Sequence, residues 1–251
     1  MDKLIYTVMT GATGTLSRQA AVSNNLANVS TQGYRAEEHR LRAAQVLTHN
    51  TSPAALPTRA FAVDASTHSD FSEGALNYTG GVYDVAVRGK GWIALAMPDG
   101  TEAYTRAGGF ETSENGVLQT RNGIPVQGDG GPISIPPDSI VSIEVDGTVS
   151  VVPETGAKNT VNAVGRIKLV NPPETDLVRG PDGLFRLNTG DAAPLDEKVR
   201  VAAGYLENSN VNPVDQMVAM ISLARQFEMQ MRMITTAEAN DRAATQVLAP
   251  R

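Results

Sequence analysis

The sequence lacks cysteine altogether, has few aromatic residues and contains no long apolar run. Without cysteine the chain has no disulfide bond, thiolate metal site or cysteine nucleophile. Because aromatic residues make up only 5%, its strands must be built from Val, Ile, Leu and Ala. No stretch approaches the roughly 20 apolar residues that span a bilayer, and the N-terminus lacks the basic-then-apolar pattern of a cleaved signal peptide. We therefore expect no membrane insertion, and we expect any export to use another route.

Net charge and chain length further restrict the possible partners and functions. A net charge of −6 and a sequence pI near 5.1 argue against nucleic acid or an anionic membrane surface as a partner. At 251 residues with 41% hydrophobic content, the chain can bury a sizeable core. The composition is that of an ordinary folded protein, so the organisation along the chain has to distinguish between functions.

The N-terminal stretch LIYTVMTGATGTLSRQAA permits two interpretations. Its glycine pair, Gly11 and Gly14, could belong to the phosphate-binding loop of a dinucleotide-binding enzyme. Such a fold needs a third glycine, where this chain has Ser17, and then a second strand, where it has NNLANVSTQGYR. The alternative is one continuous helix over 3–28, in which the glycines allow close helix–helix approach. We favour the helix and keep the nucleotide-binding enzyme as the weaker alternative.

Helical periodicity marks both ends of the chain. Steps of three and four residues define one stripe on each terminal helix. The N-terminal stripe comprises Ile5, Met9, Ala12, Leu16, Gln19, Ser23 and Leu26, and the C-terminal stripe comprises Met217, Met220, Ala224, Phe227, Met231 and Ile234. Asn212 as N-cap and Pro213 at the first helical position signal the start of the second helix. We expect the two helices to pair as a coiled-coil-like layer.

Between about 80 and 205 the pattern changes to that of strands separated by turn pairs. VSIEVDGTVSVV is the clearest hairpin, with a type I′ turn expected at Asp146-Gly147. Residues 36–80 lack clear periodicity and are predicted to be an extended connector. The fold class is therefore mixed α+β, with a discontinuous helical domain over 1–35 and 205–251 and a central, mainly antiparallel β domain over 81–204.

No catalytic or metal-binding pattern accompanies these elements. His39, His49 and His68 fall in the connector at spacings that match no helical metal pair. The chain has no Gly-x-Ser-x-Gly elbow, His-Glu-x-x-His or Walker A sequence. We predict a protein that is not an enzyme, with no catalytic, cofactor-binding or metal site.

The positive feature is the pair of helices, whose stripes mix apolar with polar or small residues. Two helices alone bury too little surface to be stable, and methionine-rich faces suit adaptable contacts. We therefore predict that neighbouring chains complete the pair, with a purely intramolecular core as the alternative. The residues expected at the subunit contact are Ile5, Met9, Leu16, Leu26, Met217, Ile221, Phe227, Met231 and Ile234.

Three parts of the sequence resemble one known family, the axial proteins of the bacterial flagellum. NNLANVSTQGYR (24–35) is similar to the signature of its rod and hook subunits. YDVAVRGKGWIAL, YTRAGGF and NGIPVQGDGGPISIP are similar to their β domain, and GYLENSNVNPVDQMVAMISLARQFEMQMRMI (204–234) resembles their closing helix. Within the family the proximal-rod subunits are the nearest type. The signature residues are Asn25, Leu26, Ala27, Asn28, Gly33 and Tyr34, of which Gly33 is expected to supply a turn conformation.

The resemblance implies a structural subunit of the flagellar basal-body rod. Such subunits assemble helically into a hollow drive shaft that transmits torque, with their terminal helices inside and the β domain outside. The implied partners are copies of the chain itself, neighbouring rod proteins and the flagellar export apparatus, which would deliver the chain to the periplasm without a cleaved signal peptide. The alternatives are a distal-rod type of subunit and a non-flagellar binding module that dimerises through its terminal helices.

Overall fold

The computed structural model describes residues 2–45, 60–153 and 161–248. The chain divides into two compact units. The helical unit comprises Met1–Asn28, Ala36–Asp70 and Val211–Arg251, and the β unit comprises Val29–Arg35 and Phe71–Asn210. Residues 29–35 thus belong to the β unit, whereas the sequence predicts them in the helical domain.

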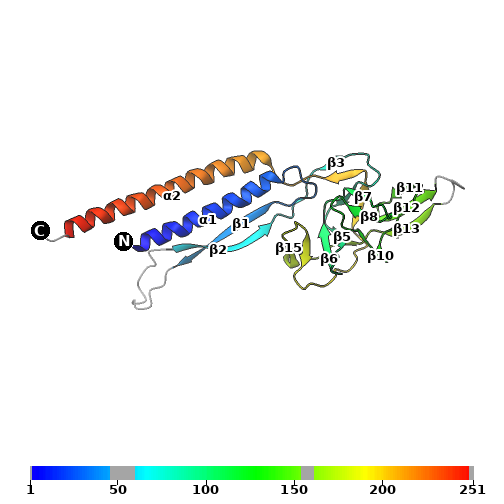
Figure 1. Ribbon diagram of the computed structural model, residues 1–251, viewed down its shortest axis with the longest axis horizontal. Helices are drawn as coiled ribbons and strands as arrows, with labels where there is room; N and C mark the ends of the chain where they lie inside the picture. The colour runs from blue at the N-terminus through cyan, green and yellow to red at the C-terminus, as the bar shows by residue number, and fades with distance from the viewer. Residues whose placement is uncertain (1, 46–59, 154–160, 249–251) are drawn as a thin grey trace. The chain divides into compact units, whose positions relative to one another are not determined.

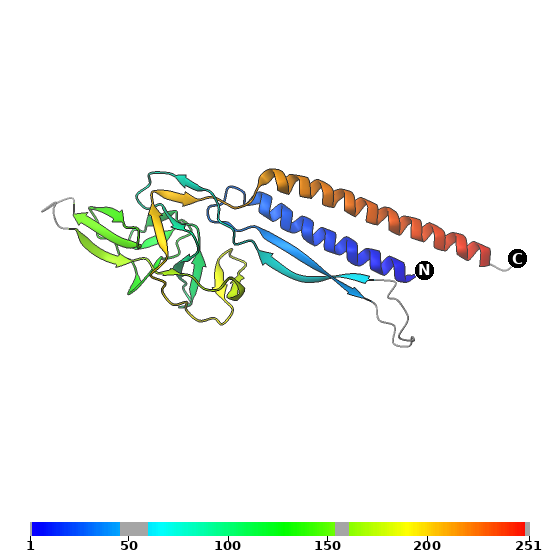
Figure 2. The ribbon, with the colours of Figure 1, turned by 180° about the vertical axis from the view of Figure 1, so that it is seen from behind.

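The described part of the helical unit contains two long helices and one hairpin (Figures 1 and 2). The helices are α1 (Asp2–Ala27) and α2 (Pro213–Leu248), and the strands of the hairpin are β1 (Glu37–Gln45) and β2 (Ala60–Ser69). Both helices confirm the prediction. The start of α2 is also as predicted, because the Asn212 Oδ1 accepts the Val214 N–H at 3.0 Å and Pro213, which has no N–H to satisfy, follows the cap.

The hairpin replaces most of the extended connector that the sequence predicts over 36–80. Its strands pair antiparallel along their length, with a register shift between Arg40 and Leu41. Such a shift moves every following side chain to the other face of the strand. The period-2 pattern therefore breaks in the middle of the strand, which hides the hairpin from a reading of the sequence. The connector prediction is wrong for these residues.

The β unit is built from small antiparallel sheets (Figure 1). Its elements are β3 (Leu76–Tyr78), β4 (Val85–Arg88), β5 (Trp92–Ala96), β6 (Glu102–Thr105), β7 (Phe110–Thr112), β8 (Leu118–Thr120), β9 (Gln127–Gly128), β10 (Gly131–Pro132), β11 (Ser139–Ile143), β12 (Thr148–Pro153), β13 (Asn162–Arg166), β14 (Leu169–Val170), the short 3-10 helix η1 (Glu174–Asp176), β15 (Leu177–Arg179), β16 (Phe185–Leu187), β17 (Arg200–Ala203) and β18 (Tyr205–Glu207). The largest sheet has the order β14-β5-β6-β16-β15, and a three-stranded sheet has the order β11-β12-β13. Strands β17 and β4 pair, as do β18 and β3, β7 and β8, and β10 and β9.

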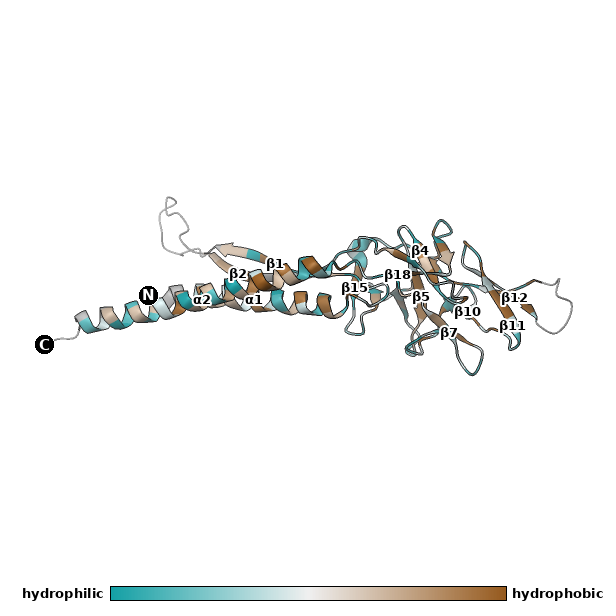
Figure 3. Ribbon diagram, turned by 90° about the horizontal axis from the view of Figure 1, so that it is seen from above, coloured by the Kyte–Doolittle hydropathy of each residue, from teal (hydrophilic) through white to brown (hydrophobic). Residues whose placement is uncertain are grey.

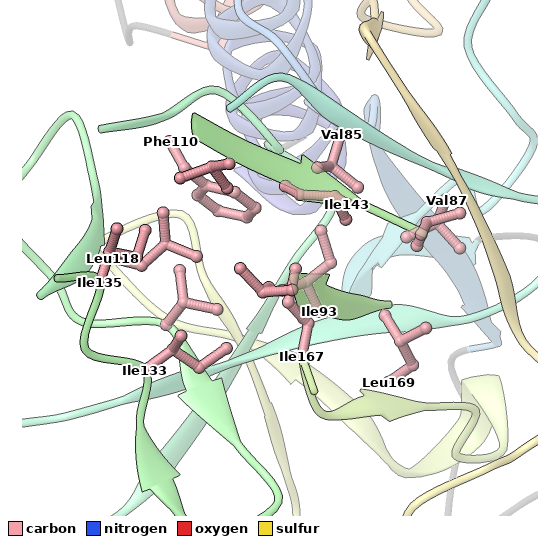
Figure 4. Packing of buried hydrophobic residues seen from close by; sticks show 14 of the residues in the cluster. Val85, Val87, Ile93, Phe110, Leu118, Ile133, Ile135, Ile143, Ile167 and Leu169 are labelled. Carbon is pink, nitrogen blue, oxygen red and sulfur yellow. The ribbon is translucent and has the colours of Figure 1, made fainter. Parts of the chain in front are cut away.

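An apolar cluster fills the interior of the β unit (Figure 4). Ile93, Leu118 and Ile167 have no exposed surface, and Val85 and Val87 of β4 pack beside them. Burying one side chain of this size stabilises the folded state by about 1.5–3 kcal/mol. A second cluster contains Trp92 of β5 and Phe185 of β16, whose ring centroids lie 4.7 Å apart. The β unit therefore has an apolar core of its own.

The hairpin of β11 and β12 forms where the sequence predicts it, but with a different turn. The Gly147 N–H donates to the Glu144 carbonyl oxygen at 2.9 Å. A type I′ turn needs a positive φ at both central residues, and among the described non-glycine residues only Asp138 has one. Gly147, with φ 89°, instead follows a type I turn as the left-handed bulge residue. The type I′ prediction is wrong.

Candidate assembly surface and signature loop

The seam between α1 and α2 includes polar side chains of both helices. Three glutamines of α2 accept hydrogen bonds from three polar side chains of α1. The pairs are Thr15 Oγ1 to Gln230 Oε1 at 3.2 Å, Arg18 Nη2 to Gln226 Oε1 at 3.3 Å, and Asn25 Nδ2 to Gln216 Oε1 at 3.5 Å. Residues later in α1 pair with residues earlier in α2, so the helices run antiparallel. None of these three hydrogen bonds joins residues of the two stripes predicted from the sequence.

Gly11 and Gly14 lie inside α1 and serve its packing. The helix is unbroken through both glycines, so the stretch before them is not the strand that a dinucleotide-binding fold requires. A Cβ at position 11 would lie 3.2 Å from the Gln230 Nε2, and one at position 14 would lie 2.8 Å from the Leu41 Cδ1. The glycines bring α1 close to α2 on one side and to the hairpin on another. The structure contradicts the nucleotide-binding alternative.

The residues expected at the subunit contact are exposed or half-buried within this chain. Between 42% and 55% of the surface is exposed for Met9, Leu16, Met217, Ile221 and Met231. The half-buried members are Ile5, Leu26, Phe227 and Ile234. None of them is fully buried within the single chain. Apolar residues recur along both helices in Figure 3.

Leu16 and Met231 lie together on the side of the helix pair that faces away from the hairpin. Successive residues of a helix are rotated by about 100°. Thr15 faces α2 and Gly14 faces the hairpin, so Leu16 points to the opposite side. Gln230 faces Thr15 across the seam. Because the helices run antiparallel, Met231, which follows Gln230, points to the same side as Leu16, which follows Thr15.

Other apolar residues share this side because they are spaced three or four residues, or whole turns, from these two. We call this set the apolar face. It comprises Ile5, Leu16, Phe227, Met231 and Ile234. Ile5 and Leu16 of one predicted stripe thus lie on the same side as Phe227, Met231 and Ile234 of the other.

A groove lies between α1 and the hairpin. It has a volume of about 520 Å³ and a mainly apolar lining. Its walls include Tyr6, Thr10, Thr13 and Ser17 of α1, and Leu41 and Phe61 of the hairpin. The sequence of α1 carries no charge between Lys3 and Arg18. A helix side that faces water is normally rich in charged residues. Neither the groove side of α1 nor its apolar face has that composition.

Asn25 and Asn28 of the signature fix the end of α1. Asn25 is 2% exposed; its Nδ2 donates to the Glu37 carbonyl oxygen at 2.8 Å, and its Oδ1 accepts the Glu37 N–H at 2.8 Å. The Asn28 N–H and Nδ2 both donate to the Asn24 carbonyl oxygen, at 3.1 and 2.9 Å. The side chain of Asn25 thereby ties α1 to the first residue of β1. Leu26 and Ala27, also in the signature, are half-buried and exposed.

Gly33 and Tyr34 of the signature belong to the β unit. Gly33 has φ 65°, the turn conformation that the sequence predicts, and its N–H donates to the Glu207 carbonyl oxygen at 2.8 Å. A Cβ at this position would lie 2.3 Å from the Ala107 nitrogen, so a larger residue does not fit. Tyr34 is buried, and the centre of its ring lies 4.4 Å from the guanidinium carbon of Arg179.

Arg35, directly after the signature residues, enters a buried ion cluster. Its Nη2 lies 2.7 Å from the Glu207 Oε1, and the Arg106 Nη1 lies 3.1 Å from the Glu207 Oε2. The three side chains are at most 4% exposed. The Glu207 Oε1 also accepts the Gly74 N–H at 2.9 Å. One carboxylate therefore holds the signature loop, β18 and the end of β6 together.

Burial is the main influence on the pKa of Arg106 and lowers it from its ordinary value. The Glu207 carboxylate opposes this shift, while the neighbouring Arg35 cation adds to it. Two buried cations thus pair with the same carboxylate, so the cluster depends on Glu207. Sequence reasoning missed Glu207 and Arg106, because the partners of the signature loop lie far from it along the chain. The available signal was a charged residue, Arg35, within an otherwise uncharged signature.

Candidate metal sites are absent from the part of the chain that the structure describes. No group of three or more His, Cys, Asp or Glu side chains there is placed to hold a metal ion. His39 lies on β1 and His68 on β2, and His49 falls outside the described residues. No helix within these residues is long and apolar enough to cross a membrane.

Three family models match the chain in order along the sequence. The model described as "Flagella basal body rod protein" matches residues 5–35. The "Flagellar hook protein FlgE/F/G D1 domain" model matches residues 86–151, and the "Flagellar basal body rod FlgEFG protein C-terminal" model matches residues 202–247. The matches therefore include α1 with the signature loop, much of the β unit, and α2.

Curated proteins match over nearly the whole length. The chain is 41% identical over 254 residues to the flagellar basal-body rod protein FlgF of Salmonella typhimurium (strain LT2), covering 99% of each chain. Identity and coverage are the same for the FlgF protein of Escherichia coli (strain K12). The rod protein FlgG of Buchnera aphidicola subsp. Schizaphis graminum is 32% identical over 235 residues, which cover 86% of this chain and 88% of that protein.

Proposed function

This chain belongs to the FlgF family of flagellar basal-body rod proteins, and we propose that it assembles through the exposed apolar residues of its two helices. It is a structural subunit of the proximal rod and not an enzyme. Members of a rod assemble with other rod proteins, so each must present surfaces that stay incomplete in the single chain. The observation that supports this role is the apolar face, where Leu16 is 49% and Met231 42% exposed.

Assembly gains free energy by covering this face. Fully burying a large apolar side chain contributes about 1.5–3 kcal/mol. Leu16 and Met231 are already about half-buried, so each adds roughly 1 kcal/mol when a neighbour covers it. A contact of several such residues per subunit, repeated along a filament, supplies the cohesion that a torque-bearing shaft needs. Methionine side chains also adapt to neighbours of differing shape.

The proposal extends to the arrangement of neighbouring subunits and to the route by which the chain reaches the rod. Neighbouring subunits extend the helix pair into a coiled-coil-like layer that surrounds a central channel, related by a helical operator with non-closing contacts. The subunit reaches the periplasm through the flagellar export apparatus, without a cleaved signal peptide and without inserting into the membrane. The three-and-four spacing of both stripes supports the layer.

A single substitution tests the role of the apolar face. Met231→Asp places a carboxylate in the contact and is expected to abolish incorporation into basal bodies, measured by immunoblotting of purified basal bodies. Met231→Leu keeps the apolar volume and should be incorporated normally. Trp92, the only tryptophan, reports by its fluorescence that the β unit of each purified variant is folded. Incorporation of the aspartate variant at the level of the leucine variant would contradict the proposal.

A further inference from the structure

We propose that the apolar face of one copy of this chain packs into the groove between α1 and the hairpin of the next copy. The inference rests on the proposed function and adds which two surfaces meet. It assigns a partner, a second copy of the chain, to a groove formed by the described residues of α1 and the hairpin.

The two surfaces differ in composition and adjoin at Met9, which lines the groove and lies two turns from Leu16. Gly14 of α1 lines the groove and contacts Leu41, whereas Leu16 points away from the hairpin. A contact between unlike surfaces of identical chains is heterologous, and it propagates unless its rotation closes a ring. Each added copy then presents a fresh groove to the next. A contact between two identical apolar faces would end at a dimer.

The chemistry of the two surfaces is complementary. The groove offers the rings of Tyr6 and Phe61 and the branched side chain of Leu41. The apolar face offers Leu16, Phe227 and Met231, whose side chains are long or flexible enough to reach into it. Neither set includes a carboxylate or a lysine or arginine cation. Depletion of charge is the compositional mark of the centre of a protein–protein contact.

The identity of the occupant follows from the chain itself. The helical unit carries both the groove and the apolar face, and neither includes a charged side chain. A single contact between two copies therefore covers one surface of each kind. Exposed apolar area on a chain without a partner is a liability for solubility. Tyr6 is 62% exposed and Leu16 49% exposed, and one contact between two copies covers the Tyr6 of one and the Leu16 of the other.

Cysteine crosslinking tests this contact with little background, because the chain contains no cysteine. One allele carries Leu16→Cys and an epitope tag, and a second, untagged allele carries Thr13→Cys. Both are expressed in the same motile cells, and their basal bodies are purified and oxidised. Thr10→Cys and Ser17→Cys scan neighbouring turns of the groove, so the axial register need not be known. Glu228→Cys, an exposed charged position on α2, replaces Leu16→Cys as the matched control.

The expected product is a covalent dimer of a tagged and an untagged copy, formed with Leu16→Cys at least tenfold more efficiently than with Glu228→Cys. A dimer formed by Leu16→Cys alone would mean that identical faces meet, which overturns the proposal. The proposal also fails if no groove position crosslinks although all variants are incorporated. Failure of the single variants to enter basal bodies would count against the proposed function instead.

A photoreactive benzoylphenylalanine at position 16 gives an independent readout of what covers this residue. Mass spectrometry of the crosslinked peptides should recover residues of α1 or the hairpin from a second copy. Recovery of peptides from a different rod protein alone would overturn the choice of occupant. An adduct only within the same chain would show that nothing covers the apolar face.

Discussion

The β unit and the helical unit differ in how much apolar surface each buries by itself. The β unit encloses a continuous cluster with several residues that have no exposed surface. Among the α2 side chains that the structure describes, Leu223 is the only buried apolar one, and three side-chain hydrogen bonds connect α2 to α1. One unit can therefore fold on its own contacts, whereas the other keeps its apolar residues for neighbouring subunits. The four predictions below test this difference, beginning with the largest effect.

Glu207→Gln should destabilise the β unit more than any other substitution considered. It removes the carboxylate that pairs with both Arg35 and Arg106, and breaking a buried ion pair in this way costs about 3–5 kcal/mol. Urea unfolding followed by Trp92 fluorescence measures the change. Glu174→Gln is the matched control, because Glu174 pairs with the exposed Lys90. Equal unfolding midpoints for the two variants would show that the buried cluster contributes nothing to the β unit.

Gly33→Ala should lower the free energy of unfolding of the β unit by about 2–3 kcal/mol, because it combines left-handed backbone strain with a steric overlap. The added Cβ would meet backbone atoms of Arg106 and Ala107, which cannot move aside as a side chain can. Gly130→Ala serves as control, since a Cβ there meets nothing within 4 Å. The same urea titration applies to both, and a neutral Gly33→Ala would disprove the role assigned to the signature turn.

Gly11→Ala should affect the helical unit alone and stabilise it by up to about 1 kcal/mol through helix propensity. The new Cβ would lie 3.2 Å from the end of the Gln230 side chain, which can shift. Gly14→Ala should gain less, because its Cβ would lie 2.8 Å from Leu41. The helix content of the purified monomers, measured by circular dichroism at the helix band, distinguishes the two. A change in the Trp92 transition would contradict the independence of the units.

The β unit should lose a small part of its stability as the pH falls below the ordinary Asp pKa of 3.8. The hydrogen bond from Arg186 lowers the pKa of Asp182 in the folded state. This contribution is therefore complete above pH 3.8 and is lost as the pH falls through the lowered value. Because Asp182 is partly exposed, the effect is a few tenths of a kcal/mol. Urea titrations of the parent and of Asp182→Asn should converge at low pH; a constant difference would exclude this linkage.

Much of the helical unit could be predicted from the sequence, because helix signals are local. The start of α2 at Asn212 and Pro213 and the unbroken α1 both follow from spacing and capping. The sequence also identified the exposed stripe residues, but it could not show that they lie side by side. That arrangement depends on the antiparallel direction of the helices and on Thr15 and Gln230, which are far apart along the chain.

The parts that the sequence did not reveal depend on register or on long-range pairing. The shift between Arg40 and Leu41 disrupts the strand pattern of the hairpin. The position of Gly33 in a turn was predictable from its residue type, whereas its fit against Ala107 was not. Likewise, no local sequence pattern distinguishes Glu207 from an exposed carboxylate. Its role appears only when the fold brings Arg35 and Arg106 to it.

Limited proteolysis of the purified monomer, with mass spectrometry of the products, tests the central difference between the units most directly. The account predicts a resistant fragment within residues 71–210, with α1, the hairpin and α2 removed early. The same digestion of assembled basal bodies should leave both helices protected. Resistance of the intact monomer from residue 1 would contradict the account, because the helical unit would then be stable without neighbouring subunits.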